Sequence, residues 1–246
     1  MRLIEVHNLS KNFGGVQALF EVDFCVQSGE IVGLIGANGA GKTTLFSVIS
    51  GFYKPDSGTV KFNERNINGL KPYQICRMGM VRTFQVVKPF LNMTVRKNVM
   101  VGRLFGKNKT TRQKKAEIEA DEIIDFVGLT KKSMVPAREL TLADHKRLEI
   151  ARSLGTNPDL LLLDEVLAGL TPTETAEAMK LVERIRQKGV TILMVEHVMK
   201  AVVGLCDRII VLHYGCKIAE GRPREIVENP DVIEAYLGES LDVGKS

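Results

Sequence analysis

Several features that would decide the class of this protein are absent from its sequence. The four cysteines, Cys25, Cys76, Cys206 and Cys216, lie far apart and form no CxxC pair, which argues against a zinc site and against a disulfide framework. The first ten residues, MRLIEVHNLS, carry early charges and no apolar core of signal-peptide length. No apolar run is longer than Leu160–Leu163, far too short for a bilayer. We therefore expect a protein of the reducing cytoplasm that does not cross a membrane itself, although it can dock on one that does.

The size and composition are those of an ordinary globular chain. A length of 246 residues suits one large α/β domain, or a core with a smaller inserted lobe. Hydrophobic residues make up 44% and charged residues 26%, so nothing predicts disorder. The net charge of +5 permits a phosphate ligand, nucleic acid or a membrane surface as a partner, and it selects none of them.

Short β-rich runs alternate with helical patterns at both ends of the chain, and no internal repeat is visible. A capping pattern, Thr171-Pro172-Thr173-Glu174, opens a helix that ends at Lys188-Gly189. Strands alternating with helices predict a mainly parallel, doubly wound sheet whose ligand lies beyond the carboxyl ends of its strands. The predicted elements are strands at Leu3–Val6, Ala18–Val26, Ile31–Ile35, Thr59–Phe62, Leu160–Leu163, Val190–Val195 and Arg208–Leu212, and a helix at Thr43–Ser50.

The sequence pattern changes in residues 88–152, because the alternation typical of strands becomes weak there. Ala116–Phe126 carries apolar residues at helical spacing, namely Ile118, Ile123 and Phe126. The basic run Lys107–Lys115 is interpreted as a solvated loop and helix start rather than a nucleic-acid patch, since no aromatic residues are interleaved. We predict a helical subdomain at 88–152, inserted into a nucleotide-binding core formed by 1–87 and 153–246.

The stretch GANGAGKT matches the pattern GxxxxGK[ST] in full, between a predicted strand and a predicted helix. Glycines let such a loop wrap a phosphate chain with its N–H groups pointing inward, and the helix N-terminus adds a positive dipole end. The lysine offers a charge to the outer phosphates, and the first threonine can ligate Mg²⁺. A plain glycine turn would not explain the Lys-Thr pair. The predicted nucleotide-binding residues are Gly36, Ala37, Asn38, Gly39, Ala40, Gly41, Lys42, Thr43 and Thr44.

Further candidates follow other predicted strands. The apolar run Leu160–Leu163 ends in Asp164, which can hold the Mg²⁺ shell, and in Glu165, which can orient and activate an attacking water. His197 follows the strand Val190–Val195 at the same sheet edge, and we predict that it contacts the γ-phosphate. Gln85 closes another β-like run. His7 and His213 are interpreted as structural.

In this order the motifs resemble those of the ATP-binding subunits of ABC transporters, over essentially the whole chain. The resemblance implies an α/β P-loop NTPase fold, named after the phosphate-binding loop Gly36–Thr43, in which a RecA-like core with a mainly parallel sheet carries an N-terminal antiparallel β portion and the inserted helical subdomain. Within that family the sequence is most similar to the importers of branched-chain amino acids. The ATPases of lipopolysaccharide export share many of these features, so that substrate class stays an alternative. The resemblance to the importers is carried by Gly33–Phe46, Val81–Gln85, Arg147–Arg152, Val195–Val198 and the tail Ile233–Gly238.

The resemblance assigns roles to single residues. Phe13 would stack on adenine, and Ala168–Thr171 would form the D-loop. The residues implied in catalysis are Lys42, Gln85, Glu165 and His197, and those implied in holding Mg²⁺ are Thr43, Gln85 and Asp164. The signature segment Leu140–Asp144 would contact the ATP of a partner subunit through Thr141, Ala143 and Asp144.

The resemblance also implies ligands and partners. ATP and Mg²⁺ would be bound in a head-to-tail dimer, between the P-loop of one subunit and the signature of the other. The second ATP-binding subunit would be identical or different, and membrane-spanning permease subunits would dock near Val86–Asn98. A solute-binding protein would act indirectly, and the chain would lie peripherally at the cytoplasmic face of the cell membrane. We expect no nucleic-acid partner.

Two other readings stay open at this point. ABC-type ATPases that act on nucleic acid usually carry two cassettes, long coiled coils or zinc insertions, and this chain has one cassette, no heptads and no cysteine cluster. A regulatory subunit that binds nucleotide without hydrolysing it would not need both Glu165 and His197.

The signature departs from the usual family spelling LSGGQ, because it reads LTLAD. Thr141 keeps the hydroxyl. Ala143 replaces a glycine, and its Cβ limits how closely the backbone can approach a phosphate. A carboxylate at 144 about 4 Å from a phosphate charge would cost on the order of 4 kcal/mol at an effective dielectric near 20. A hydrogen bond at the helix cap contributes only about 0.5–2 kcal/mol, too little to offset that cost. We therefore expect Asp144 to turn away from the phosphate and back to the helix cap at Thr141. Val166, where relatives have proline, affects loop stiffness more than chemistry.

Overall fold

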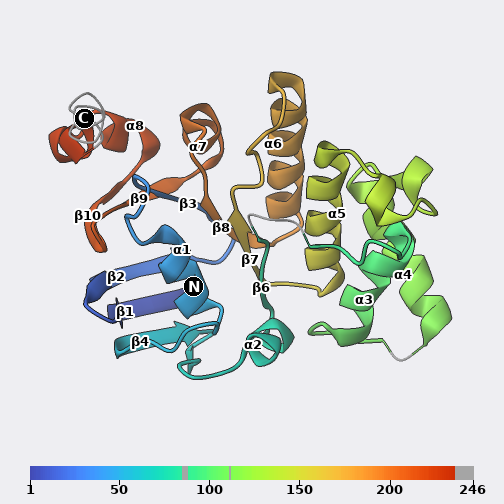
Figure 1. Ribbon diagram of the computed structural model, residues 1–246, viewed down its shortest axis with the longest axis horizontal. Helices are drawn as coiled ribbons and strands as arrows, with labels where there is room; N and C mark the ends of the chain where they lie inside the picture. Colours follow the sequence, from blue (N-terminus) through green and yellow to red (C-terminus); the bar gives the residue numbers. More distant parts are fainter. Residues whose placement is uncertain (85–87, 111, 236–246) are drawn as a thin grey trace. The chain divides into compact units, whose positions relative to one another are not determined.

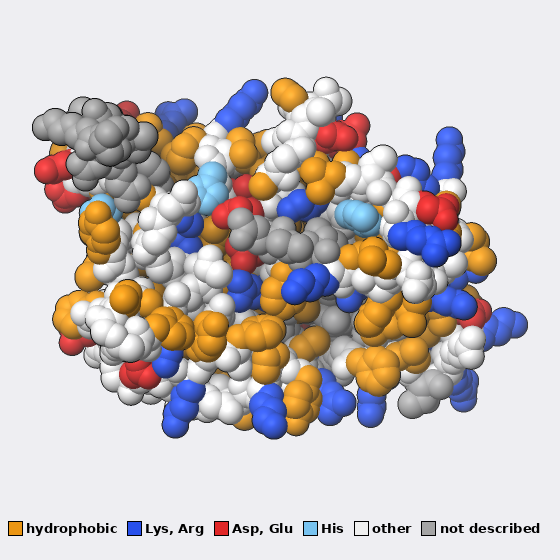
Figure 2. Space-filling model, viewed as in Figure 1, with side chains coloured by type: hydrophobic (Ala, Val, Ile, Leu, Met, Phe, Trp, Pro, Cys, Tyr) orange, Lys and Arg blue, Asp and Glu red, His pale blue; other side chains and the backbone are white. Residues whose placement is uncertain are grey.

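The computed structural model describes residues 1–84, 88–110 and 112–235 (Figure 1). The chain divides into two compact units, one formed by Met1–Pro72 with Thr191–Ser246 and the other by Tyr73–Val190. Figure 2 shows the side chains of the same face, where exposed hydrophobic groups are scattered among charged ones. Among the described residues, no helix combines the length and the apolar character needed to cross a membrane. The proposed limits of the helical subdomain, 88–152, stay a prediction.

The first unit begins with an antiparallel sheet of order β2-β1-β4-β5. Strands β1 and β2 are much longer than the predicted strands at Leu3–Val6 and Ala18–Val26. The register of the β1–β2 pair shifts between Val6 and Leu9, and Asn8 lies there at a φ of 46°. Such a bulge inserts an extra residue, which breaks the alternation of apolar side chains while the strand continues. The strands are β1 (Arg2–Phe13), β2 (Val16–Gln27), β4 (Ser57–Phe62) and β5 (Arg65–Asn66).

The same unit contains a second set of strands in the order β10-β9-β3-β8. Strands β3 and β8 are buried along their whole length, as continuous apolar runs predict for parallel strands. Strand β10 was not predicted, and it pairs antiparallel with β9. The elements are β3 (Ile31–Ile35), β8 (Thr191–Val195), β9 (Arg208–His213), β10 (Cys216–Gly221), α1 (Lys42–Ile49), α7 (Met199–Leu205) and α8 (Pro223–Val227).

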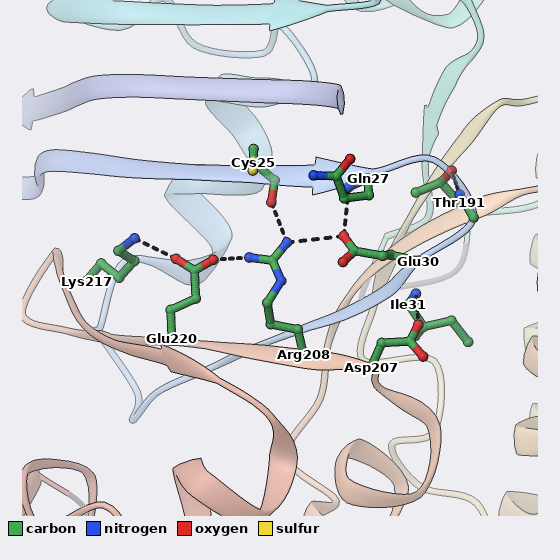
Figure 3. A network of polar contacts seen from close by, with 10 residues as sticks. Cys25, Gln27, Glu30, Ile31, Thr191, Asp207, Arg208, Lys217 and Glu220 are labelled. Atoms are coloured by element: carbon green, nitrogen blue, oxygen red, sulfur yellow. Dashed lines mark hydrogen bonds and ion pairs between the residues drawn. The ribbon is translucent and has the colours of Figure 1, made fainter. Parts of the chain in front are cut away.

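A polar network centred on Arg208 joins the antiparallel sheet to the parallel strands (Figure 3). The Arg208 guanidinium donates to the backbone carbonyl of Cys25 on β2 at 2.6 Å and to Glu30 at 3.1 Å. It also pairs with Glu220 on β10, which Lys217 contacts at 2.6 Å. One side chain on β9 thereby fixes three neighbouring segments, which supports β3 and the loop that follows it.

The second unit holds a pair of parallel strands and five helices of seven or more residues within its described part. Strands β6 and β7 pair in register, with Arg82 opposite Leu162. Figure 1 shows helices α3, α4 and α5 side by side. The elements are α2 (Pro72–Met78), β6 (Met80–Arg82), α3 (Val95–Phe105), α4 (Gln113–Phe126), α5 (Leu142–Gly155), β7 (Leu160–Asp164), α6 (Pro172–Gln187) and two short 3₁₀ helices, η1 (Thr130–Lys132) and η2 (Ala137–Glu139).

Two sequence predictions for this unit have different outcomes. The capping box that opens α6 is confirmed: the Thr171 hydroxyl accepts from the Glu174 N–H at 3.3 Å, and the Glu174 carboxylate accepts from the Thr171 N–H at 2.8 Å. The predicted helix at Ala116–Phe126 is part of α4, but Ile118 is 55% exposed. The buried stripe of α4 consists of Ala116, Ala120 and Ile124, which are spaced four residues apart and so lie on one face of the helix.

Helices α3 and α5 approach each other through glycines. A Cβ added to Gly102 on α3 would lie 2.6 Å from the carbonyl oxygen of Arg152 and 2.9 Å from the carbonyl carbon of Gly155, both on α5. The two backbones therefore touch at a place where even a methyl group does not fit.

We predict that Gly102→Ala lowers the free energy of unfolding by about 1–3 kcal/mol, although alanine is the better helix former, because the methyl group forces the two helices apart. Chemical denaturation followed by circular dichroism measures this change. The matched control is Gly15→Ala, whose added Cβ would meet nothing within 4 Å. Equal stabilities for the two variants would contradict the predicted backbone contact.

Candidate functional site

The glycine-rich loop Gly36–Gly41 connects β3 to α1, as predicted. Lys42 is buried, and its ammonium donates to the carbonyl of Gly36 at 2.6 Å and to that of Ala37 at 2.8 Å. Gly36 has a φ of 152°, and a Cβ there would lie 2.2 Å from the carbonyl oxygen of Leu212. The loop therefore curves around the lysine ammonium and admits only glycine at its first position.

Helix α1 presents its N-terminus at the end of this loop. Gly41 is its N-cap in the left-handed conformation, and no acidic residue lies in the first turn. The first N–H groups of a helix have no partner within the helix, and they carry the positive end of its dipole. Thr43 is exposed in this first turn. Lys42, these N–H groups and the Thr43 hydroxyl are the kinds of groups that bind a phosphate chain at a helix N-terminus.

His197 lies at the same sheet edge as the glycine-rich loop. Strands β3 and β8 are parallel and pair with Leu34 opposite Val195, so both strands end within one residue of each other. Gly36 follows one strand and Glu196-His197 follows the other. The His197 side chain is exposed, whereas Glu196 is buried. The expected proximity to the loop is thus a property of the fold, while the contact of His197 with a γ-phosphate stays a prediction.

Phe13 forms an exposed aromatic platform at the end of β1. The ring is 40% exposed, and the Tyr53 ring contacts it edge to face at a centroid distance of 5.0 Å. The Lys11 ammonium lies 5.3 Å from the ring centroid. A held but accessible ring is suited to stacking on a planar base, which is the role predicted for Phe13.

In the second unit, Asp164 ends β7 and forms a buried ion pair with Arg82. The Arg82 guanidinium donates to the Asp164 carboxylate at 2.7 Å, and both side chains are less than a tenth exposed. The Asp164 N–H donates to the Thr83 hydroxyl at 2.9 Å. Sequence reasoning did not find Arg82. Its position offered a signal, because Arg82 lies in a β-like run just before the helical region. A charged residue that is buried in a strand requires a partner of opposite charge.

Glu165 directly follows Asp164 and leaves the strand in a strained conformation. Its φ is 50°, in the left-handed region, which costs a residue other than glycine about 1 kcal/mol or more. Its carbonyl accepts from the Ala168 N–H at 3.3 Å and from the Lys146 ammonium at 2.9 Å. Such strain is often kept at functional sites, where the surroundings enforce it.

Gln85 lies outside the described residues, but the residue before it is held firmly. The Phe84 N–H donates to the carboxylate of Glu149 on α5 at 2.6 Å. Burial raises the pKa of Glu149, although this hydrogen bond and the nearby Lys146 and Arg152 act in the opposite direction. Glu149 was not predicted as part of the site, and it fixes the backbone of the residue directly before Gln85.

The signature residues lie at the N-terminus of α5. Thr141 is the N-cap, and its hydroxyl accepts from the Asp144 N–H at 3.3 Å. The Asp144 carboxylate turns back onto this cap, as the capping pattern predicts, and accepts from the Thr141 hydroxyl at 2.8 Å. An unpredicted partner completes the group, because the Lys132 ammonium pairs with the same carboxylate oxygen. The acidic residue in the signature is therefore matched by a cation from η1.

We predict that Lys132→Met raises the pKa of Asp144. Burial alone would raise it, but the contacts with Lys132 and Thr141 outweigh burial and hold this pKa below its ordinary value. Because folding lowers the pKa, the interaction stabilises the chain above the pKa of the unfolded aspartate, and this stabilisation is lost as the pH falls through the folded value. Carboxylate NMR titration measures the shift, with Lys131→Met as the control. An unchanged pKa in Lys132→Met would refute the pairing.

The predicted Mg²⁺ ligands have the donor chemistry that this ion prefers. Mg²⁺ binds hard oxygen atoms, usually through one or two protein groups together with phosphate oxygens and water. The Thr43 hydroxyl and the Asp164 carboxylate are such groups. The described residues contain no cluster of three or more His, Cys, Asp or Glu side chains that would hold a metal alone. Each of these groups by itself has the chemistry of a ligand to a metal that also binds phosphate; their joint role in one site stays a prediction.

The sequence matches a family model described as ABC transporter over residues 19–168, and one described as branched-chain amino acid ATP-binding cassette transporter over residues 216–242. Three similar proteins are named as branched-chain amino acid transport ATP-binding protein LivG. The protein of Salmonella typhimurium is 45% identical and that of Escherichia coli 43%, each over 97% of this chain and 98% of the relative. The protein of Archaeoglobus fulgidus, named as probable, is 36% identical over 97% and 96%.

Solved structures give the same result. A nucleotide-free ATP-binding cassette from an ABC transporter has a TM-score of 0.88 at 32% identity, covering 96% of this chain and 99% of the other. A cassette in its ADP conformation has a TM-score of 0.88 at 33% identity, covering 97% and 99%. Motifs, fold and relatives agree along nearly the whole length. The chain belongs to the ABC transporter family and is an ATP-binding cassette with the P-loop ATPase fold of that family.

Proposed function

We propose that this chain is the ATP-hydrolysing subunit of an importer of branched-chain amino acids. The observation that carries the proposal is the end-to-end similarity to proteins named as branched-chain amino acid transport ATP-binding proteins. The match of residues 216–242 to a model of the same transporter class supports it independently of the ATPase motifs. The nucleotide-binding fold alone does not account for this match, because the matched residues lie outside the ATPase motifs.

The proposed reaction is the hydrolysis of ATP to ADP and phosphate. Lys42 and the N–H groups at the start of α1 bind the phosphates, and Phe13 stacks on the adenine. Thr43, Asp164 and Gln85 would hold Mg²⁺, which neutralises phosphate charge when it is bound. Glu165 orients and activates the attacking water, and His197 contacts the γ-phosphate.

The proposed partners are a second ATP-binding subunit and membrane-spanning permease subunits. In a head-to-tail dimer, Thr141, Ala143 and Asp144 of this chain face the ATP of the partner. The chain would then lie at the cytoplasmic face of the membrane as a peripheral subunit. A solute-binding protein would deliver the amino acid to the permease.

A surface next to α3 supports the proposed docking of the permease. Phe90, Leu91 and Met93 are between 39% and 51% exposed, and Figure 2 shows hydrophobic side chains gathered over the region of α3. The fully buried Asn98 holds their loop: its side-chain oxygen accepts from the Phe90 N–H at 2.9 Å, and its amide donates to the Phe90 carbonyl at 3.1 Å. An exposed apolar loop on such a rigid support is typical of an interaction surface.

The same unit contains a cavity of about 260 Å³, and part of α3 lines it. Tyr73, Phe84 and Phe105 supply aromatic walls, and Arg152 lines it too. The Arg152 guanidinium also lies 5.1 Å from the centre of the Phe90 ring and donates to the Lys88 carbonyl at 2.9 Å. A hollow with aromatic walls beside an exposed apolar loop suits the docking of a short helix from a membrane subunit.

We predict that Glu165→Gln keeps nucleotide binding but lowers ATP hydrolysis by a factor of at least about 10², because the loss of a general base costs that much. Lys42→Ala loses the affinity itself, since it removes the charge that faces the phosphates. Fluorescent-nucleotide titration and phosphate release measure the two effects. Normal hydrolysis by Glu165→Gln would remove Glu165 from the proposed mechanism.

The same variants test the transport function. In proteoliposomes that contain the chain with its co-purified membrane subunits and solute-binding protein, ATP should drive the uptake of leucine, isoleucine or valine. Glu165→Gln should abolish this uptake. A complex that hydrolyses ATP without any response to these amino acids would contradict the proposed substrate.

A separate prediction concerns the signature. Ala143→Gly combined with Asp144→Gln should raise ATP hydrolysis in the assembled transporter, because the change restores backbone access and the neutral amide of the usual signature. The two single variants show how much of the change in hydrolysis rate each substitution causes. Unchanged turnover would show that the LTLAD spelling is functionally neutral.

A further inference from the structure

Lys146 is a buried charged residue on α5 to which none of the predicted roles applies. It is only 5% exposed, and its ammonium donates to the backbone carbonyl of Glu165 at 2.9 Å. Lysine is rarely buried unless its charge and its donors are compensated. A lysine kept in the interior to contact one backbone carbonyl indicates that the conformation of that peptide group matters.

The backbone of Glu165 needs such support. Its φ of 50° is unfavourable for a residue with a Cβ. The Ala168 N–H also donates to its carbonyl, at 3.3 Å, which is long for a hydrogen bond. The next residue is Val166, which leaves the backbone before it unrestrained, whereas a proline there would restrict it. The contact from Lys146, at 2.9 Å, is shorter than the one from Ala168.

The surroundings of the Lys146 ammonium are acidic. Its positive charge opposes the effect of burial on Glu149, which is one turn away on the same helix, and the charge of Asp164 also influences Glu149. A positive charge near the Glu149 carboxylate is favoured, so this carboxylate adds to the contact with the Glu165 carbonyl. Its position is thus set before any ligand is considered.

We propose that Lys146 is a positioning residue for hydrolysis, which holds the catalytic Glu165 in its left-handed conformation through the Glu165 carbonyl. This inference rests on the proposed function, in which Glu165 activates water. Thr141 and Lys146 belong to the same helix and its cap, so the segment that faces the partner's ATP also supports the base that serves this chain's own ATP. A shift of α5 is thereby transmitted to Glu165.

The test compares variants of the chain in its purified complex with the membrane subunits. Lys146→Met keeps the length of the side chain and removes the donor. It should lower kcat about ten- to a hundredfold, as a small misplacement of a catalytic group does, and change the KM for ATP less than about twofold. Lys146→Arg, which keeps a charged donor, should restore most of the rate. The exposed Lys180 on α6 supplies the control, since Lys180→Met should leave kcat unchanged.

A double-mutant cycle separates positioning from simple damage to the fold. In a Glu165→Gln background, Lys146→Met should cause no further loss in single-turnover rate, because the group that Lys146 positions is already absent. An equal loss in both backgrounds, or a normal kcat in Lys146→Met, would overturn the inference. If wild-type chain bound no ATP, or Glu165→Gln hydrolysed it normally, the proposed function itself would fail.

Discussion

In-register pairing of parallel strands is the constraint on which the rest of the structure depends. Within the first unit, the pairing of β3 with β8 makes both strands end together, so the glycine-rich loop and His197 leave from one edge. Within the second unit, the pairing of β6 with β7 brings Thr83 beside Asp164 in the same way. Because side chains at strand ends inherit their positions from the register, a slip of one residue would turn each to the wrong face.

The unusual signature shows how a charge can be tolerated where the family has none. An aspartate in a segment that is proposed to face phosphate is unfavourable by about 4 kcal/mol if its charge points at the ligand. Here the carboxylate is turned to the helix cap and neutralised by Lys132, at a site that is only partly buried. The substitution of glutamine by aspartate therefore affects geometry and hydrogen bonding more than net charge.

The parts of the site that follow from local rules could be predicted from the sequence. Strand, loop and helix around Gly36–Thr43, the carboxylates after β7 and the cap of α6 all depend on residues that are close together in the chain. The length of β1 could not be predicted, because a bulge near Asn8 hides the alternation of its side chains. Strand β10, whose residues are mostly half-buried, has no clear apolar pattern.

The contacts that support the site depend on the tertiary structure instead. Arg82 reaches Asp164 across 82 positions, and Lys146 reaches Glu165 across 19. Lys132, which pairs with Asp144, comes from a 3₁₀ helix outside any motif. A single sequence contains no local signal for such pairs, since only packing decides which of many lysines and arginines lies near a given acid.

The glycine contact between α3 and α5 gives the second unit a mechanical property. Helix α5 has 14 residues and is thus about 21 Å long. Its C-terminal end is in backbone contact with α3 at Gly155, and its N-terminal end carries Thr141. The close contact at Gly155 leaves no room for the C-terminal end of α5 to move toward α3. Lys146 lies between this contact and Thr141, so the helix that carries the signature is also joined to the Glu165 backbone.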